Sequence, residues 1–411
     1  MGVLVRKNQG NIILTRIAKL AVIGFLTSFA AALIDTIWAV YMEELLGNMV
    51  LVGLFSAGLT IIAFFAFFFL VPFIERKNKS KLYSLSLELY AIIYLLFAIS
   101  RSPYIFAILA VVTTILTTLR ITSFGIIIRD KSMERELSRN EGVMYTIMNA
   151  AWVIGPLIAG LLSEFLGINF IFVISAIFMI LALISFKISR IEDANLKKRI
   201  DKNMFRNFME FFKNKNRVLA YVIGGGVPFW WALIYLFIPM FIIQSGLPIE
   251  WVGYFLFAIA VPMIIFTYVF AKLAGKIGFK KLFKIGFFIL FACVLTCFFV
   301  SGIPTLFGLN NIYIILGILV LASVGMAMLE STVEAYFFDL MKEKEELHFY
   351  GPYNTNLEVS RLIAYSISSL ILIFLPFKYV FLFFALVMAA YFILSFKIKE
   401  IIEKRRDNRK N

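Results

Sequence analysis

The sequence predicts an all-α integral membrane protein, with twelve transmembrane helices in two pseudo-symmetric six-helix bundles. Composition is the first observation: 62% of the 411 residues are hydrophobic and the mean hydropathy is +0.92, well outside the range of soluble proteins. The second is a series of twelve apolar runs, each long enough to cross a hydrocarbon core of ~30 Å. The third is an internal repeat that relates the two halves of the chain.

The apolar runs define the expected spans, since roughly 20 residues of α-helix cross the hydrocarbon core at about 1.5 Å per residue. The predicted spans are 17–41, 48–72, 82–100, 103–128, 140–163, 168–187, 217–243, 249–272, 282–301, 311–338, 350–375 and 378–396. We therefore expect a basic cytoplasmic N-terminus at 1–16, a first bundle at 17–187, a basic cytoplasmic linker at 188–216, a second bundle at 217–396 and a basic cytoplasmic tail at 397–411.

The repeat can be read directly along the chain. Six residues recur 200 positions later: Gly24, Val52, Gly53, Phe55, Lys81 and Leu82 match Gly224, Val252, Gly253, Phe255, Lys281 and Leu282. Past a longer loop the offset becomes 209, which matches Asp130 with Asp339 and Gly142 with Gly351. Two parallel repeats of this kind form a pseudo-twofold body with a cavity near the bilayer midplane, an arrangement suited to alternating access.

The charge distribution predicts the orientation of the chain. The formal net charge is +15, and nearly all of the 40 Lys and Arg residues fall in the termini and in the loops of one side. Arg101 and Lys378 are the exceptions in the opposite loops, so the pattern places both termini in the cytoplasm and the multi-pass chain in the cell membrane. The basic inner face is expected to attract anionic lipids. A nucleic-acid partner is not expected, because the basic residues do not lie beside stacking aromatics on a soluble surface.

Charged side chains within the spans mark the candidate site, because a charge near the bilayer centre is costly and faces a cavity or a partner. Asp35 lies in span 1, and Arg120 lies on a polar stripe of span 4. Arg120 forms either a structural ion pair or part of a substrate site.

Two further pairs of charges lie in the second half. Glu330 and Glu334 are four residues apart in span 10 and are expected on one helical face, where two carboxylates disfavour double ionisation and suit a proton carrier. Glu358 and Arg361 are three residues apart in span 11, and they either neutralise each other or belong to the site. With Asp35 and Arg120 these groups sum to −2, which favours protons and cationic substrates over anions.

Aromatic and amide side chains accompany these charges. Asp35 shares a helical face with Trp38, and the repeat matches Asp35 with Tyr235. An acid beside large aromatic rings suits an organic cation, whereas the alternative for Trp38 is the aromatic belt at the membrane interface. The repeat also matches Asn149 and Trp152 of span 5 with the charged pair of span 11.

Helix breakers occur inside several spans. Span 7 contains Gly224–Gly226 followed by Pro228 and Pro239, and span 8 contains Pro262. Such residues either provide gating bends or only disturb helix packing, because proline removes a backbone donor that neighbouring groups must replace.

Three local patterns carry a family resemblance. The loop after span 2 reads Glu75-Arg76-Lys77-Asn78-Lys79, span 5 contains Gly155-Pro156-Leu157-Ile158-Ala159-Gly160, and span 4 contains Arg120. With the repeat, the twelve spans and the charge bias, these patterns resemble the major facilitator superfamily over essentially the whole chain. The resemblance implies the major facilitator fold. It also implies that Glu75, Arg76 and Lys79 help to latch the halves together on the cytoplasmic side, with Asn78 in place of the usual glycine.

The span 5 pattern is similar to an element of proton-coupled exporters, in which Gly155, Pro156 and Gly160 would allow close helix approach and gating. The resemblance thus implies a secondary active transporter, and the acidic spans favour proton-coupled export (antiport) of a small amphipathic or cationic compound by alternating access. The alternative is an uptake symporter or facilitator for a small nutrient, such as an acid that Arg120 and Arg361 would clamp.

An enzyme is not expected. The single histidine, His348, lies in a loop, and the sequence contains neither an Asp-rich metal motif nor a Gly-rich phosphate loop. We therefore expect no catalytic residue, metal or cofactor. The expected partners are a small-molecule substrate, protons and the lipid bilayer, and the chain is expected to be a monomer.

Overall fold

The computed structural model describes residues 5–8, 11–14, 16–131, 137–191, 204–306, 309–341 and 343–401. Within these residues it is an all-α membrane protein with twelve helical segments that are long and apolar enough to cross a membrane. The segments are Ile17–Leu46, Met49–Ile74, Lys79–Ile99, Pro103–Arg129, Gly142–Leu166, Ile168–Ile188, Lys215–Gln244, Glu250–Ile277, Phe279–Val300, Asn311–Leu340, His348–Phe374 and Lys378–Ser395. The twelve predicted spans are confirmed, with the largest differences at Leu46 and Ile277, which were expected at 41 and 272.

The first half of the chain consists of spans 1–6, and each span is one helix. These helices are α1 (Arg16–Leu46), α2 (Met49–Arg76), α3 (Lys79–Ile99), α4 (Pro103–Lys131), α5 (Leu137–Leu166) and α6 (Ile168–Ile188). A two-stranded hairpin, β1 (Val5–Asn8) and β2 (Asn11–Leu14), precedes α1. Sequence patterns did not indicate this hairpin in the basic N-terminus.

The second half consists of spans 7–12, and three of these spans are built from more than one helix. Span 7 comprises α8 (Lys215–Gly224), α9 (Gly226–Ala232), the π-helix η1 (Leu233–Phe237) and α10 (Ile238–Gln244). Span 10 comprises α13 (Asn311–Leu329) and α14 (Thr332–Leu340), and span 11 comprises the end of α15 (Glu343–Asn354) and α16 (Asn356–Phe374). The remaining elements are α7 (Met204–Phe212), α11 (Glu250–Ile277), α12 (Phe279–Val300), β3 (Thr305–Leu306), β4 (Leu309–Asn310) and α17 (Lys378–Ser395).

The chain divides into two compact units. Unit 1 contains Met1–Gly47, Ile61–Ile200 and Leu247–Phe257, and unit 2 contains Asn48–Thr60, Asp201–Gly246 and Ala258–Asn411. The first turns of α2 therefore group with unit 2, and the first turns of α11 group with unit 1. Residues 192–203 of the expected linker and 402–411 of the expected tail lie outside the described residues.

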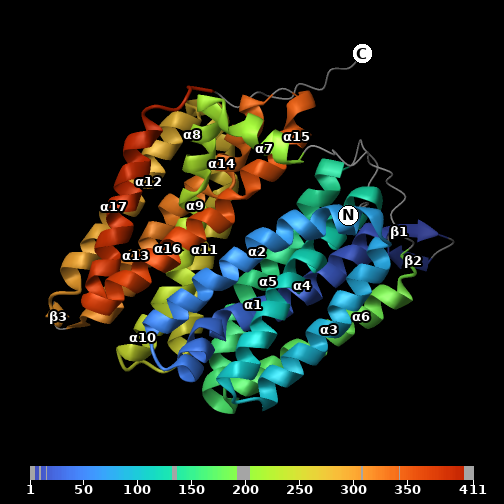
Figure 1. Ribbon diagram of the computed structural model, residues 1–411, viewed down its shortest axis with the longest axis horizontal. Coiled ribbons are helices and arrows are strands. Elements are labelled where there is room, and N and C mark those ends of the chain that lie inside the picture. The colour runs from blue at the N-terminus through green and yellow to red at the C-terminus, as the bar shows by residue number, and fades with distance from the viewer. Residues whose placement is uncertain are drawn as a thin grey trace. The chain divides into compact units, whose positions relative to one another are not determined.

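Within unit 1, α1 is the central helix. It packs against α5 and α6, and α3 packs against α4 and α6 (Figure 1). Small residues such as Ala30, Ala32 and Ala39 are fully buried along α1. Without bulky side chains at these positions, neighbouring backbones can approach closely, which is the main source of helix association in lipid.

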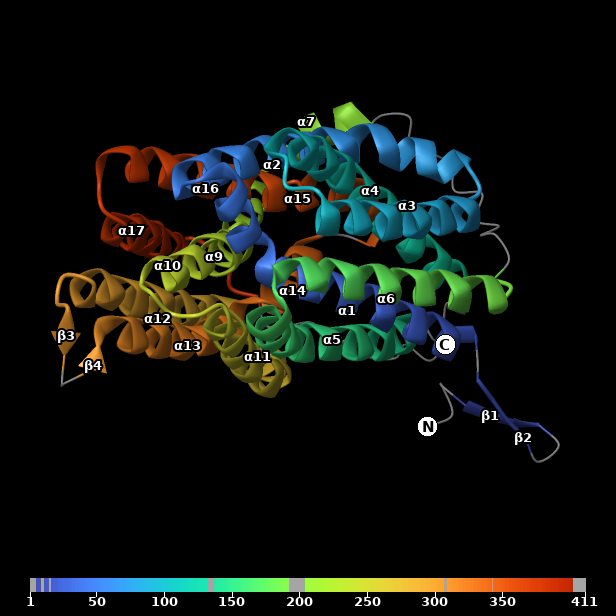
Figure 2. The same cartoon turned by 90° about the horizontal axis from the view of Figure 1, so that it is seen from below.

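Within unit 2, α12 is flanked by α13 and α17, and the β3–β4 hairpin joins the ends of α12 and α13 (Figure 2). Separate contacts join α9 to α16 and α8 to α14. The interrupted spans 7, 10 and 11 thus meet one another within this unit.

The predicted small-residue element of α5 is a close-packing surface in unit 1. A Cβ atom added at Gly155 would lie 2.7 Å from the Ala32 Cβ of α1, and one added at Gly160 would lie 2.7 Å from the Gly253 Cα of α11. Pro156 lies inside α5 without interrupting it. The element therefore lies where helices approach closely, and it does not break its own helix.

The repeated loop after spans 2 and 8 is built in two ways. Asn78 has an extended backbone (φ −69°) and caps α3 by accepting a hydrogen bond of 2.7 Å from the Lys81 amide. Its counterpart Gly278 instead adopts φ +81°, a conformation that favours glycine. The turn before α3, with Asn78, thus differs in backbone conformation from the turn before α12, with Gly278, but in both halves the helix starts at the next residue. Arg76 is exposed and Lys79 is buried, whereas the Glu75 side chain is outside the described part.

Candidate functional site

In unit 1 the candidate site is centred on Arg120 of α4. Its guanidinium carbon lies 5.4 Å from the centroid of the Tyr90 ring on α3. The Tyr90 hydroxyl forms a hydrogen bond of 2.5 Å with Thr117 Oγ1 and donates to the Thr113 carbonyl at 3.2 Å. The polar stripe predicted on span 4 therefore faces α3 within the protein. Tyr90 forms hydrogen bonds with two of its residues, Thr113 and Thr117.

The Arg120 side chain retains binding capacity in this arrangement. Its Nε atom is buried and has no hydrogen-bond partner among the described residues. A buried cationic donor without a partner is energetically costly, and an acceptor that reaches it would gain a charge-assisted hydrogen bond. Arg120 is therefore the group of unit 1 that is best suited to contact an acceptor on a substrate.

Asp35 occupies a distinctive position on α1. It is exposed, whereas its neighbours Ile34 and Thr36 are buried. Asp35 also acts electrostatically on Tyr90 and Tyr94, so it lies near the tyrosines that surround Arg120. The helix that forms the centre of unit 1 thus exposes a carboxylate within the span, apart from the glutamates at its end.

Trp38 has a packing role. Its ring centroid lies 5.5 Å from that of Phe97 and 5.5 Å from that of Phe106. These rings belong to an aromatic cluster that also includes Tyr41 and Phe172. Part of the Trp38 ring surface is therefore engaged in packing and is withheld from a substrate.

In unit 2 the candidate site is centred on Glu330. The Trp231 indole Nε1 donates a hydrogen bond of 3.0 Å to Glu330 Oε2, and the Trp231 ring lies 5.3 Å from the Tyr235 ring between centroids. Along span 7, Val227, Trp231 and Tyr235 recur every four residues and are partly exposed between buried neighbours. This accessible stripe brings the carboxylate and two aromatic rings together.

Departures from α-helical geometry place these groups. Glu330 follows the last residue of α13, and α14 begins only at Thr332. Trp231 lies in the last turn of α9, and the π-helix η1 begins two residues later at Leu233. Pro239, near the start of α10, cannot donate a hydrogen bond to the Tyr235 carbonyl. π-helical turns often occur at functional sites. Here one lies on the Trp231 side of the Glu330–Trp231 hydrogen bond, and a turn between two α-helices lies on the Glu330 side.

The structure changes the interpretation of the Glu330–Glu334 pair. The two residues were expected on one face of a continuous helix, but the helix is interrupted at Glu330 and Ser331. The Tyr350 hydroxyl of α15 donates a hydrogen bond of 2.8 Å to Glu334 Oε1. The two carboxylates therefore have separate hydrogen-bond partners, while Glu334 still acts electrostatically on Glu330. Glu330 is the more buried of the two.

The other predicted site residues divide between the units. Asn149 and Trp152 lie on α5 in unit 1, and Asn149 is exposed. Glu358 and Arg361 lie in the first turns of α16 in unit 2, where Arg361 acts electrostatically on Glu358. With all candidate groups ionised, unit 1 carries no net charge from Asp35 and Arg120. The predicted net charge of −2 therefore belongs entirely to unit 2.

The predicted set of site residues lacks three that contact the candidate charges, namely Tyr90, Trp231 and Tyr350. Trp231 had a detectable signal, because it lies four residues before Tyr235 on the same helical face. Tyr90 and Tyr350 had none, because their partners are remote in sequence, on α4 and on α14. Helical periodicity relates residues only within one helix.

Searches against known proteins place this architecture among transporters. The family model for the Major Facilitator Superfamily matches residues 20–355. No curated protein sequence matches the chain significantly. Among solved structures, the fold is similar to a POT family transporter in complex with 5-aminolevulinic acid, with a TM-score of 0.75, 11% identity and coverage of 93% of this chain and 95% of that one.

Two further structures share the fold at low identity. The nucleoside transporter NupG has a TM-score of 0.72 at 14% identity, with coverage of 94% of this chain and 100% of that one. A bacterial homologue of the iron transporter ferroportin, in an inward-facing state, has a TM-score of 0.73 at 14% identity, with coverage of 93% and 98%. The described residues contain no cluster of three or more side chains that would hold a metal ion. The protein is a transporter and not an enzyme, and the chain belongs to the major facilitator superfamily.

Proposed function

We propose that the protein is a proton-coupled antiporter that exports a small amphipathic or cationic compound by alternating access. In this proposal it spans the cell membrane with both termini in the cytoplasm. The observation that carries it is Glu330, a partly buried carboxylate at a helix interruption in span 10, which accepts a hydrogen bond of 3.0 Å from the Trp231 indole. Intramembrane acids of this kind mark ion pathways and proton relays.

The surroundings of Glu330 also favour a cationic substrate. The accessible stripe of span 7 adds the Trp231 and Tyr235 rings beside the carboxylate. A carboxylate attracts a cation by charge, and an aromatic face adds about 0.5–2 kcal/mol when it lies against the cation. A proton and an organic cation would then compete for one carboxylate, which is the condition for their exchange in opposite directions.

The experiment has two stages. A thermal-shift screen of purified protein at two pH values uses ethidium and tetraphenylphosphonium as cations and 5-aminolevulinic acid as a small acid. Proteoliposomes, with the membrane potential clamped at zero, are then given an acidic interior and the stabilising cation outside. Antiport predicts accumulation of the cation that ceases when nigericin collapses the pH gradient. Stabilisation by the acid alone, with accumulation only when the exterior is acidic, would reject export in favour of uptake.

A second candidate function rests on Arg120. Its unpartnered buried Nε and the adjacent Tyr90 would suit a carboxylate or phosphate on a nutrient taken up by symport or facilitated diffusion. Under this alternative, 5-aminolevulinic acid stabilises the protein and Arg120→Gln abolishes the stabilisation. Under the exporter proposal, the cation-induced shift depends on Glu330 and persists in Arg120→Gln.

A further inference from the structure

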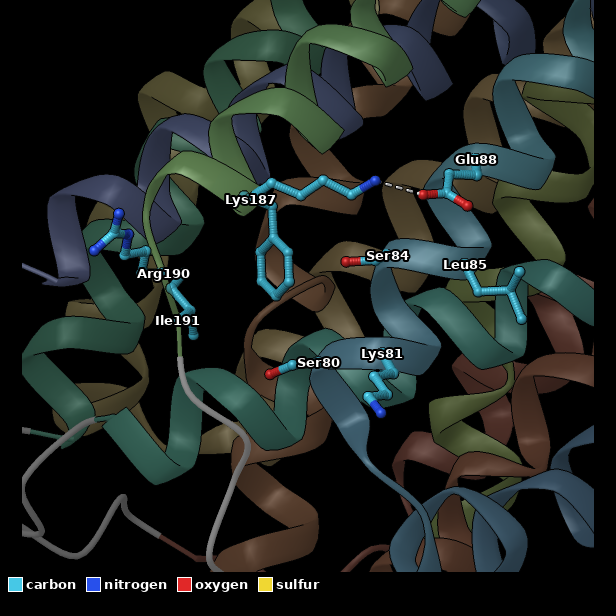
Figure 3. Close-up of a pocket in the computed structure, with 9 residues that line it drawn as sticks. Ser80, Lys81, Ser84, Leu85, Glu88, Lys187, Arg190 and Ile191 are labelled. Carbon is cyan, nitrogen blue, oxygen red and sulfur yellow. Dashed lines mark hydrogen bonds and ion pairs between the residues drawn. The ribbon is translucent and has the colours of Figure 1, made fainter.

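A pocket of about 390 Å³ lies between α3 and α6 in unit 1, and its lining contains none of the residues predicted to bind the substrate or protons. Its lining includes Ser80, Lys81 and Ser84 from the start of α3 and Lys187 and Arg190 from the end of α6 (Figure 3). Its volume lies within the range of small-molecule sites. The pocket is at the end of these helices that the charge bias predicts to face the cytoplasm.

The pocket is cationic. Lys81, Lys187 and Arg190 contribute three positive charges, and Glu88 contributes one negative charge. Lys187 Nζ and Glu88 Oε1 form an ion pair at 2.7 Å. In Figure 3 Lys187 extends across to Glu88, whereas the Lys81 and Arg190 head groups point outward at the rim. All three cationic side chains are exposed and long, so they can rotate toward an anion in the pocket.

Hydroxyl groups and an unusual backbone turn complete the lining. The Ser80 and Ser84 side chains project from α3 toward α6 (Figure 3). Arg190 has φ +46°, the only positive φ at a non-glycine residue in the described part of the chain. Glycine is the usual residue where a helix ends in this left-handed turn. The arginine side chain is therefore present at position 190 in spite of an unfavourable backbone conformation.

Exposed apolar residues continue from the pocket along both helices. On α3, Leu85, Ile92 and Leu95 are exposed in the helical register of Lys81 and Glu88. On α6, Ile180 and Ile184 precede Lys187 by seven and three residues and are also exposed. In a membrane protein such stripes face acyl chains. The basic pocket and the apolar stripes thus match the two parts of one phospholipid.

We propose that this pocket binds the phosphate headgroup of an anionic phospholipid from the inner leaflet, whose acyl chains lie along the exposed stripes of α3 and α6. Basic pockets between transmembrane helices on the cytoplasmic side recognise such headgroups. Glu88 limits the affinity, because its carboxylate competes with the phosphate for Lys187. The proposal is independent of the substrate and of the direction of transport.

The repeat supplies a matched control. Lys81 and Ser84 correspond to Lys281 and Lys284 of α12, and Lys284 lies 4.1 Å from the centroid of the Phe396 ring. The pair Lys281 and Lys284 therefore carries the same charge as Lys187 and Arg190 and lies at the helix start of the second half that corresponds to the start of α3. Bulk attraction between a basic surface and anionic lipid would respond equally to the loss of either pair.

The test is native mass spectrometry of delipidated protein with phosphatidylglycerol, with phosphatidylcholine and with soluble glycerol 3-phosphate. We expect one tightly bound phosphatidylglycerol, weakened about tenfold or more in K187A/R190A, because each basic residue near an anionic lipid contributes substantially. K281A/K284A should bind as the unmodified protein does. Glu88→Gln should bind more tightly, which tests the proposal in a variant that retains all of the cations.

Four outcomes would overturn the proposal. If K187A/R190A and K281A/K284A weakened phosphatidylglycerol binding equally, the lipid would be attracted by the basic surface in general and not by this pocket. Equal binding of phosphatidylcholine would remove the requirement for an anion. Displacement of the lipid by glycerol 3-phosphate at equal concentration would identify a site for a soluble phosphate instead. Unchanged or weaker binding in Glu88→Gln would contradict the competition between the carboxylate and the phosphate.

Discussion

Three pairs of repeated spans differ in the same way between the two halves. Spans 1, 4 and 5 are the uninterrupted helices α1, α4 and α5, and α5 continues through Pro156. Their counterparts, spans 7, 10 and 11, are interrupted near Gly225, at Glu330 and at Thr355. One ancestral pattern has therefore produced a continuous set of helices in the first half and an interrupted set in the second.

The charges follow the same division. Arg120 corresponds by the 209-residue offset to Leu329, the residue next to Glu330, so the two halves carry opposite charges at nearly equivalent depth. Arg120 lies against Tyr90 within continuous helices, whereas Glu330 lies where a helix ends. Backbone groups freed at an interruption need new partners when a helix moves. We infer that the second half contains the adjustable, ion-coupled part and that the first half provides a more rigid binding surface.

The largest expected effect uses the repeat itself, through Gly253 and its equivalent Gly53. A Cβ at Gly253 would lie 2.5 Å from the Pro156 carbonyl oxygen, whereas a Cβ at Gly53 would meet the Ser369 hydroxyl, the end of a side chain. Gly253→Ala should cost about 3 kcal/mol of unfolding free energy, because the backbone must shift, and Gly53→Ala about 1 kcal/mol. Denaturant unfolding in detergent measures both values.

The control for this pair is Ser369→Ala, which should relieve most of the cost of Gly53→Ala when the two substitutions are combined. If Gly53→Ala destabilised the protein as much as Gly253→Ala, the two equivalent contacts would be equally rigid. The proposed difference between the halves would then lose its support at these positions.

The sequence contained most of the architecture but little of this asymmetry. Apolar run length determined the spans, because crossing a bilayer imposes a minimum length on any helix. Helix interruptions were harder to locate: the glycines near Gly225 did break span 7, but Pro156 and Pro262 lie in intact helices. Span 10 breaks at Glu330-Ser331, without glycine or proline. Whether a helix continues depends on partners from other helices, which local sequence does not encode.

The candidate site was predictable to a similar extent. The cost of burying charge was enough to single out Arg120 and Glu330. Their partners Tyr90 and Trp231 depend on which helices pack together, and the interruption of span 10 at Glu330 and Ser331 has no signal in the sequence. Trp38 was assigned to the site from its proximity to Asp35 in the helix, but its ring packs against Phe97 and Phe106.

The next effect concerns the Trp231 indole, which donates to Glu330. Trp231→Phe should destabilise the protein by about 2 kcal/mol, since it removes a hydrogen bond to a partly buried carboxylate. Trp230→Phe is the matched control, because the adjacent buried indole has no hydrogen-bond partner among the described residues. Its cost should be smaller, and thermal unfolding compares the two variants. Equal costs would show that the indole of Trp231 contributes only ring packing.

A smaller effect is expected in the first half. Tyr90→Phe removes the hydroxyl that bonds to Thr117 and to the Thr113 carbonyl but keeps the ring beside Arg120. The cost should be about 1 kcal/mol, the value of a typical buried hydrogen bond. Tyr104→Phe, at a position that is 83% exposed, should change nothing. A loss well above that of Trp231→Phe would place the more sensitive polar contact in the first half.

The smallest effect is expected outside the spans, on α7. Arg206 Nε donates a hydrogen bond of 2.8 Å to Glu210 Oε1, and this bond holds the pKa of the Glu210 carboxyl below its usual range. A lowered pKa contributes stability above the unfolded-state pKa and loses it as the pH falls through the folded-state value. Because both side chains of the pair are accessible to solvent, Glu210→Gln should leave thermal unfolding unchanged at neutral pH. A clear decrease would indicate that α7 is docked through this pair.

The most direct test of proton coupling at Glu330 is the transport of the stabilising cation by Glu330→Gln in proteoliposomes, with Glu210→Gln as the matched neutralisation outside the spans. The account predicts that Glu330→Gln no longer accumulates the cation against its gradient when the interior is acidic, because the carboxylate for which the proton and the cation compete is lost. Glu210→Gln should accumulate the cation normally. Full accumulation by Glu330→Gln under the same pH gradient would contradict the account, because the proton would then have to be carried by another group.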